Sequence, residues 1–189
     1  MHEGFPYAVE ISNSGYNAFI LKYQAGQGGT VATQDLAAGV SYILRNADAL
    51  RVSATAYSLW GSSAGARMAA AIGSHGTARF GAPELPKPSA IVMAYTGHSE
   101  LGSSDPATFV VVGERDGIAP PAIMERRVAL LRRSGTEVEY HKYPGLGHGF
   151  GLGTGTSAAD WVADAVRFWE KQIKRESVPP RRSVGKPRE

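Results

Sequence analysis

AYSLWGSSAGARMAAAI, residues 56–72, is the stretch that decides the fold. Its apolar first part is suited to a strand, and the small residues of Ser63–Ile72 predict a helix that packs close to a sheet. Gly61 and Gly65 permit a sharp turn between the two, with Ser63 at its centre. In this strand–turn–helix context, the G-x-S-x-G pattern predicts a serine presented as a nucleophile.

Apolar and helical segments alternate on both sides of this turn. AIVMAY at 90–95 and ATFVVV at 107–112 are continuous apolar runs, which are typical of strands buried on both faces. The alternation predicts an α/β fold, a three-layer sandwich around a parallel sheet. The other expected elements are helices at Met1–Ser14, Gln34–Leu50 (capped by Thr30 or Thr33), Pro120–Arg133 and Ala158–Arg175, and strands at Tyr16–Tyr23, Ala54–Trp60 and Thr136–Tyr143, the last near an edge.

A serine nucleophile needs a base, and the chain has five histidines. His148 lies in GLGHGFG, 145–151, in a glycine-rich loop between the last expected strand and the closing helix. Such a loop suits an imidazole that reaches over the sheet. His141 lies within a strand and His75 and His98 lie in ordinary loops, so His148 is the candidate base.

The base in turn needs a carboxylate to orient it. Asp116 in GERDG follows a buried strand, so it is expected at the carboxyl edge of the sheet, where sites of α/β proteins lie. Glu114 competes for this role, although a surface ion pair with Arg115 would also account for it. Gly117 favours Asp116, because it lets the chain turn directly after that residue.

The strand–GSSAG–helix, GERDG and GLGHGFG segments resemble the α/β-hydrolase superfamily, and within it compact esterases of the acetyl xylan esterase and dienelactone hydrolase kind. The resemblance extends from about Phe5 to Lys174. It implies that Ser63 is the nucleophile, His148 the general base and then acid, and Asp116 its orienting partner. The amide of Ala64, at a helix N-terminus, would hold the oxyanion.

The chain departs from this group at its amino-terminal side. It contains neither the three earlier strands nor the HGGG-type loop that donates a second oxyanion N–H. We therefore expect a hydrolase-like sandwich reduced at the N-terminus, with a rearranged sheet or an edge covered by another copy of the chain. Loss of one oxyanion donor typically costs about 10²–10³ in kcat, so we expect either a slow enzyme or an amino-terminally shortened form of a normal one.

Composition and charge restrict the partners. The 189 residues include no cysteine and carry a net charge of +3, but residues 171–189 alone carry +5, which leaves the remainder at 3 − 5 = −2. We expect one domain at 1–175 and a flexible basic tail at 176–189, with no nucleic acid or membrane partner. No signal peptide is visible, so the compartment is unknown and cytoplasmic by default. No motif for a metal or an organic cofactor is present.

The sequence thus predicts a serine esterase that cleaves small acyl esters, such as acetyl esters of sugars or xylan. Trp60, Tyr95 and Phe150 are candidates to line an acyl or sugar pocket, and core packing explains them equally well. Two alternatives stay open: a catalytically silent binding or assembly module, and a lactone hydrolase or peptidase on the same scaffold.

Overall fold

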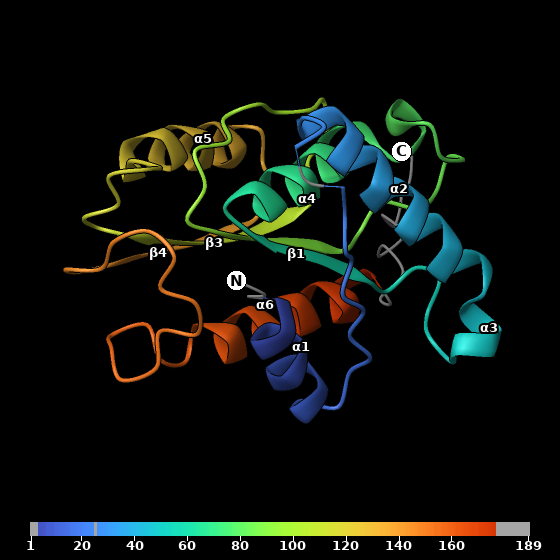
Figure 1. Cartoon of the computed structure of the whole chain (residues 1–189), viewed down its shortest axis with the longest axis horizontal. Coiled ribbons are helices and arrows are strands. Elements are labelled where there is room, and N and C mark those ends of the chain that lie inside the picture. Colours follow the sequence, from blue (N-terminus) through green and yellow to red (C-terminus); the bar gives the residue numbers. More distant parts are fainter. Residues whose placement is uncertain (1–3, 25, 177–189) are drawn as a thin grey trace, which may run out of the picture.

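The computed structural model describes residues 4–24 and 26–176, and the tail expected from 177 onward lies outside them. Four parallel strands form one sheet in the order β1-β2-β3-β4. Helices cover both of its faces: α2, α4 and α5 lie on one side and α1 and α6 on the other (Figure 1). The elements in chain order are α1 (Gly4–Asn13), α2 (Gly29–Arg45), α3 (Ala47–Leu50), β1 (Ser58–Ser62), α4 (Ala64–His75), a 3-10 turn (Ala78–Phe80), β2 (Ala90–Ala94), β3 (Ala107–Gly113), α5 (Pro121–Arg133), β4 (Val138–Tyr143) and α6 (Trp161–Glu176).

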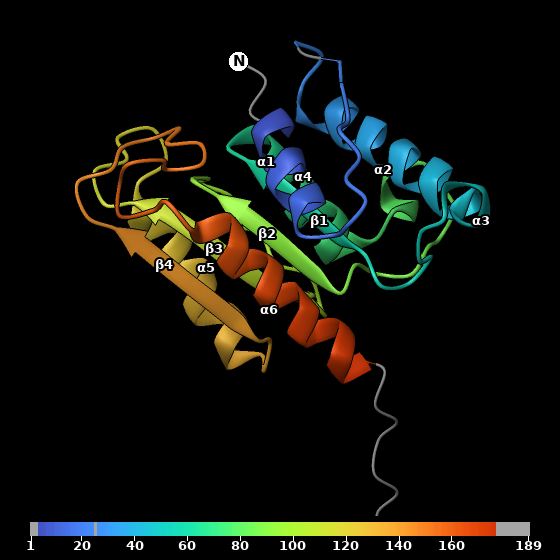
Figure 2. The ribbon, with the colours of Figure 1, turned by 90° about the horizontal axis from the view of Figure 1, so that it is seen from below.

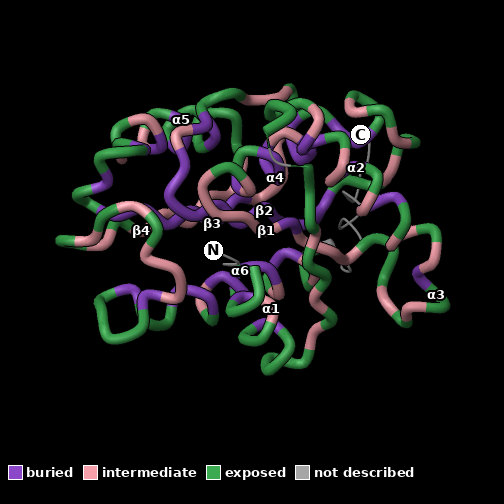
Figure 3. Tube along the Cα trace, in the orientation of Figure 1, coloured by how far each residue is buried: buried purple, intermediate pink, exposed green. Residues whose placement is uncertain are grey.

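The two apolar runs of the sequence form the centre of the sheet. Every residue of β2 is buried, and so is β3 beyond its first residue, as the purple tube in Figure 3 shows. Successive side chains point to opposite faces. Val92 and Phe109 therefore join the core under α1 and α6, whereas Met93 and Val110 join the core under α2, α4 and α5. The predicted three-layer α/β architecture is confirmed.

Small residues in α4 let this helix lie close to the sheet. A β-carbon at Gly73 would stand 2.9 Å from the side chain of Ile91 in β2, a separation that real side chains do not tolerate. This close packing sets how near the carboxyl-terminal part of α4 lies to β2.

The prediction of a strand at Tyr16–Tyr23 is wrong. This segment runs without strand pairing from α1 on one face of the sheet to α2 on the other, past β1 (Figures 1 and 2). Its polar contacts reach loops and helices instead: Asn17 donates a hydrogen bond to the carbonyl of Arg51, and the hydroxyl of Tyr16 donates one to Glu170 of α6 at 2.7 Å. A strand needs a neighbouring strand for its hydrogen bonds. The segment does not pair with β1, which is therefore the edge strand of the described sheet.

Smaller differences concern element ends. The helix expected at Gln34–Leu50 begins earlier, at Gly29, with Gly28 as its N-cap in place of Thr30 or Thr33. Thr33 is the fifth residue of the helix, and its hydroxyl donates to the carbonyl of Gly29, one turn earlier, at 2.7 Å. The strand expected at Ala54–Trp60 occupies Ser58–Ser62, whereas β4 is an edge strand as predicted.

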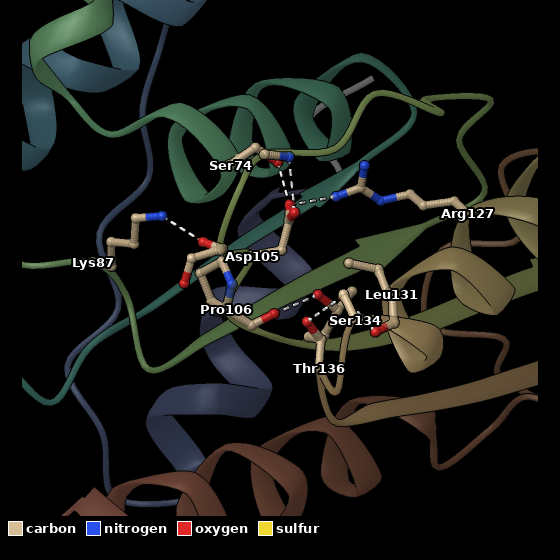
Figure 4. A network of polar contacts seen from close by, with 11 residues as sticks. Ser74, Lys87, Asp105, Pro106, Arg127, Leu131, Ser134 and Thr136 are labelled. Carbon is tan, nitrogen blue, oxygen red and sulfur yellow. Dashed lines mark hydrogen bonds and ion pairs between the residues drawn. The ribbon is translucent and has the colours of Figure 1, made fainter.

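A buried polar network anchors the connection from β2 to β3, residues 95–106. The carboxylate of Asp105 accepts hydrogen bonds from the Ser74 hydroxyl of α4, from the Arg127 guanidinium of α5 at 3.2 Å and from the amide of Gly102 at 2.8 Å (Figure 4). The side chains of Asp105 and Arg127 are 4% and 2% exposed. The network therefore ties this connection, which begins beside the site described below, to two helices.

The same connection carries His98, which is 5% exposed. Burial, reinforced by the charge of Arg127, lowers the pKa of His98 from 6.5 to about 4. Glu100 opposes this shift, and Arg67 and His75 add to it. Among the described residues no group accepts or donates a hydrogen bond at Nε2 of His98. His98 is therefore neutral in the folded protein at pH 7.

We expect the protein to lose stability between about pH 6.5 and pH 4. Below its ordinary pKa of 6.5, His98 of the unfolded chain binds a proton that the folded chain does not take up until about pH 4. The unfolded state thus holds more protons in this window, and the free energy of unfolding falls by up to about 3 kcal/mol as the pH drops. Urea unfolding at pH 7 and at pH 4.5 should show this slope in the wild type and a smaller one in His98→Gln. Equal slopes in both proteins would contradict the prediction.

No helix within the described residues is long and apolar enough to span a membrane.

Candidate active site

The turn after β1 places Ser63 in a strained backbone conformation. Its φ of 49° and ψ of −112° are rare for a residue with a side chain, and strain of this kind gathers at functional sites. A β-carbon at Gly61 would lie 2.2 Å from the carbonyl carbon of Gly65, so the turn can close only with glycine there. The amide of Ser63 donates to the carbonyl of Ala94, at the end of β2, at 2.9 Å. The turn is therefore held against the carboxyl edge of the sheet.

Three side chains from three different strand ends meet at this edge. Nε2 of His148 lies 3.0 Å from Oγ of Ser63, and Nδ1 of the same ring lies 2.8 Å from Oδ2 of Asp116. An ionised carboxylate only accepts, so it takes the hydrogen bond from Nδ1–H and leaves Nε2 to accept from the serine hydroxyl. This arrangement suits a histidine that removes the proton of Ser63.

Asp116 is held from behind by the backbone. Its Oδ1 accepts hydrogen bonds from the amides of Ile118 at 2.9 Å and Ala119 at 2.7 Å, while Oδ2 faces His148. The side chain is fully buried, and that of His148 is 16% exposed. Glu114, the competing carboxylate, accepts instead from the amide of Gly145 at 3.0 Å, within the loop that carries His148. The two amides behind Asp116 belong to a loop whose sequence carries no recognisable signal for this role.

Ala64 is the first residue of α4, so its amide has no acceptor within the helix and lies next to Ser63. The positive end of the helix dipole favours negative charge at this point. The described residues contain no group of three or more histidine, aspartate or glutamate side chains arranged for a metal ion.

The three aromatic candidates lie in different surroundings. Trp60 donates to the hydroxyl of Ser58 and faces Trp161, with its ring centroid 6.3 Å away. Phe150 packs against Tyr95, which is only 1% exposed. Contact of these three rings with a substrate stays a prediction. Tyr7 of α1, whose hydroxyl lies 2.6 Å from that of Tyr95, was not indicated by any sequence pattern.

The chain is similar to known proteins in part of its sequence and in its fold. The prolyl oligopeptidase family model matches residues 89–176. No curated protein sequence matches the chain.

Three solved structures share its architecture. An α/β hydrolase, MGS-M1, from a Medee basin deep-sea metagenome library is 23% identical, with a TM-score of 0.75, over 92% of this chain and 78% of that one. An acetyl ester-xyloside bifunctional hydrolase from Caldicellulosiruptor lactoaceticus is 19% identical, with a TM-score of 0.77, over 90% and 76%. A sugar hydrolase, YeeB, from Lactococcus lactis is 21% identical, with a TM-score of 0.76, over 93% and 84%. Together with the parallel sheet and the turn after β1, these likenesses show that the chain has the α/β-hydrolase fold.

Proposed function

We propose that the protein is a serine esterase that hydrolyses small acyl esters, with acetyl esters of sugars or xylan fragments as the preferred substrates. The observation that carries the proposal is the continuous hydrogen-bonded series from Ser63 through His148 to Asp116. The similar structures described as an acetyl ester-xyloside hydrolase and as a carboxylesterase from Lactobacillus plantarum support the substrate class.

The geometry suggests a two-step reaction. Oγ of Ser63 attacks the ester carbonyl carbon as Nε2 of His148 takes its proton, and the amide of Ala64 donates to the developing oxyanion. The intermediate collapses, the bond to the alcohol oxygen breaks, and His148 returns the proton to the leaving alcohol. A water molecule then attacks the acyl-enzyme as His148 takes its proton. The bond from the acyl carbon to Oγ breaks, and His148 reprotonates Ser63.

A peptidase is the second candidate, because the prolyl oligopeptidase family model matches residues 89–176. An amide is cleaved by the same series of groups but has a poorer leaving group. Assay of p-nitrophenyl acetate beside an acyl-prolyl p-nitroanilide separates the two, since an esterase turns over only the former at a useful rate.

Labelling with a fluorophosphonate tests the proposal directly. Oγ of an activated serine forms a bond to phosphorus, fluoride leaves, and the histidine takes the serine proton. We expect one adduct per chain, which tandem mass spectrometry of the tryptic peptide places on Ser63 and not on Ser62. Heat-denatured protein is the control and should remain unlabelled. Absence of an adduct on the folded protein would refute the esterase and favour a silent binding module.

A further inference from the structure

Hydrogen bonds hold the loop that carries His148 on either side of this residue: the amide of Arg115 donates to the carbonyl of Leu146 at 2.8 Å, and Trp161 donates to that of Gly151 at 2.9 Å. Residues 144–160 contain no helix or strand, and Gly145, Gly149 and Gly151 adopt positive φ angles. Figure 2 shows this connection (orange) folded beyond the arrowhead of β4. A side chain on such a loop must be placed by its neighbours. Ser63 and Asp116 supply two polar contacts to the imidazole, and a third contact comes from an aromatic ring.

That ring belongs to Tyr95, the residue directly after β2. Its centroid lies 5.2 Å from that of the His148 imidazole at an interplanar angle of 70°, and 4.8 Å from that of Phe150 at 67°. One ring therefore contacts two residues of the glycine-rich loop, on either side of Gly149. Edge-to-face packing of this kind has a preferred geometry, so it restrains direction as well as distance.

Tyr95 is itself fixed at both ends. Its amide donates to the carbonyl of Val111 in β3 at 2.8 Å, and its φ is 38°, a strained value for a bulky residue. At the other end its hydroxyl lies 2.6 Å from that of Tyr7, which is 5% exposed. The Tyr7 ring in turn packs edge-on against Trp161 at 5.2 Å, at the start of α6. The strained backbone and the buried hydroxyl pair together hold the Tyr95 ring in one place.

We propose that Tyr95 is a positioning residue for His148, and that Tyr7 holds the Tyr95 ring against the imidazole. The inference rests on the proposed function. Because Tyr95 is 1% exposed, it acts through His148 and not through the substrate. Its loss should therefore lower kcat and leave KM unchanged, whereas loss of a residue that binds substrate would raise KM.

Kinetics of three variants with p-nitrophenyl acetate test this role. Tyr95→Leu removes the ring and should lower kcat by about 10- to 100-fold, the cost of a misplacement near 1 Å, with KM within about twofold of the wild type. Tyr95→Phe keeps the ring and should restore kcat to within about threefold. Tyr7→Phe removes the same hydrogen bond from the other side and should match Tyr95→Phe.

A double-mutant cycle keeps the test decisive if Tyr95→Leu does not fold. Tyr7→Phe and Tyr95→Phe break one shared hydrogen bond, so the double variant should lose no more kcat than either single variant. Additive losses in kcat would overturn the role of Tyr7. Wild-type kcat in folded Tyr95→Leu, or a loss confined to KM, would overturn the role of Tyr95.

Fluorophosphonate labelling separates these outcomes from failure of the proposed function. If the wild type is labelled at Ser63 and Tyr95→Leu reacts at the same rate, the positioning role is refuted and the esterase stands. If the folded wild type is not labelled, the esterase and the positioning role are refuted together. Labelling of Tyr95→Leu about 10- to 100-fold more slowly than the wild type supports both.

Discussion

Replacing Ser63 with alanine is expected to lower kcat for p-nitrophenyl acetate by roughly 10⁴- to 10⁶-fold. Alanine removes the oxygen that lies 3.0 Å from Nε2 of His148, and with it the acyl-enzyme route. Loss of the serine or of the histidine of such a triad costs about as much as loss of the whole, so the remaining rate should come from substrate binding and the oxyanion donor alone. Circular dichroism and thermal unfolding should match the wild type, because alanine keeps the β-carbon in the same strained turn.

The adjacent serine supplies the control. Ser62 is the last residue of β1, whereas the hydrogen bond at Nε2 of His148 joins it to Oγ of Ser63. Ser62→Ala should therefore keep kcat within a few-fold of the wild type and should still be labelled by the fluorophosphonate. Retained turnover in Ser63→Ala, or its loss in Ser62→Ala alone, would move the nucleophile away from Ser63.

Local patterns predicted the parts of the fold whose cause is local. Continuous apolar runs at 90–95 and 107–112 had to be buried on both faces, and β2 and β3 are the buried centre of the sheet. The segment Tyr16–Tyr23 has an equally strand-like composition but no strand beside it, and pairing depends on a neighbour that composition does not reveal. The threonines at 30 and 33 were attractive caps, yet the helix begins at Gly29, where the chain turns at Gly28.

The candidate site likewise combines features that the local sequence predicts with features that it does not. Ser63, Asp116 and His148 each follow a strand, and parallel strands bring their carboxyl ends to one edge, so order along the chain was enough to predict that they meet. The choice between the two carboxylates had a weaker basis in the sequence, because Glu114 and Asp116 are two residues apart and only Gly117 favours Asp116. Tyr7 lies 88 positions from Tyr95, and a contact of that range leaves no periodic signal.

The choice between the two carboxylates can be tested with one isosteric change in each. Asp116→Asn keeps an oxygen for the amides of Ile118 and Ala119, so the loop should remain folded. The new NH₂ group, however, donates where the carboxylate accepted, and it favours the tautomer of His148 that bears its proton on Nε2. That tautomer cannot accept the proton of Ser63, and kcat should fall by about 10⁴-fold at pH 7.

Glu114→Gln is the matched control for this prediction. It removes one negative charge from the same loop but leaves an amide oxygen able to accept from Gly145, as Glu114 does. We expect less than about a tenfold change in kcat, because this side chain supports the loop and does not touch the imidazole. The reverse pattern, a large loss in Glu114→Gln and a small one in Asp116→Asn, would assign the orienting role to Glu114. Both substitutions replace a carboxylate with an amide, so a difference between them reports the direct contact with Nδ1 of His148 that Asp116 makes.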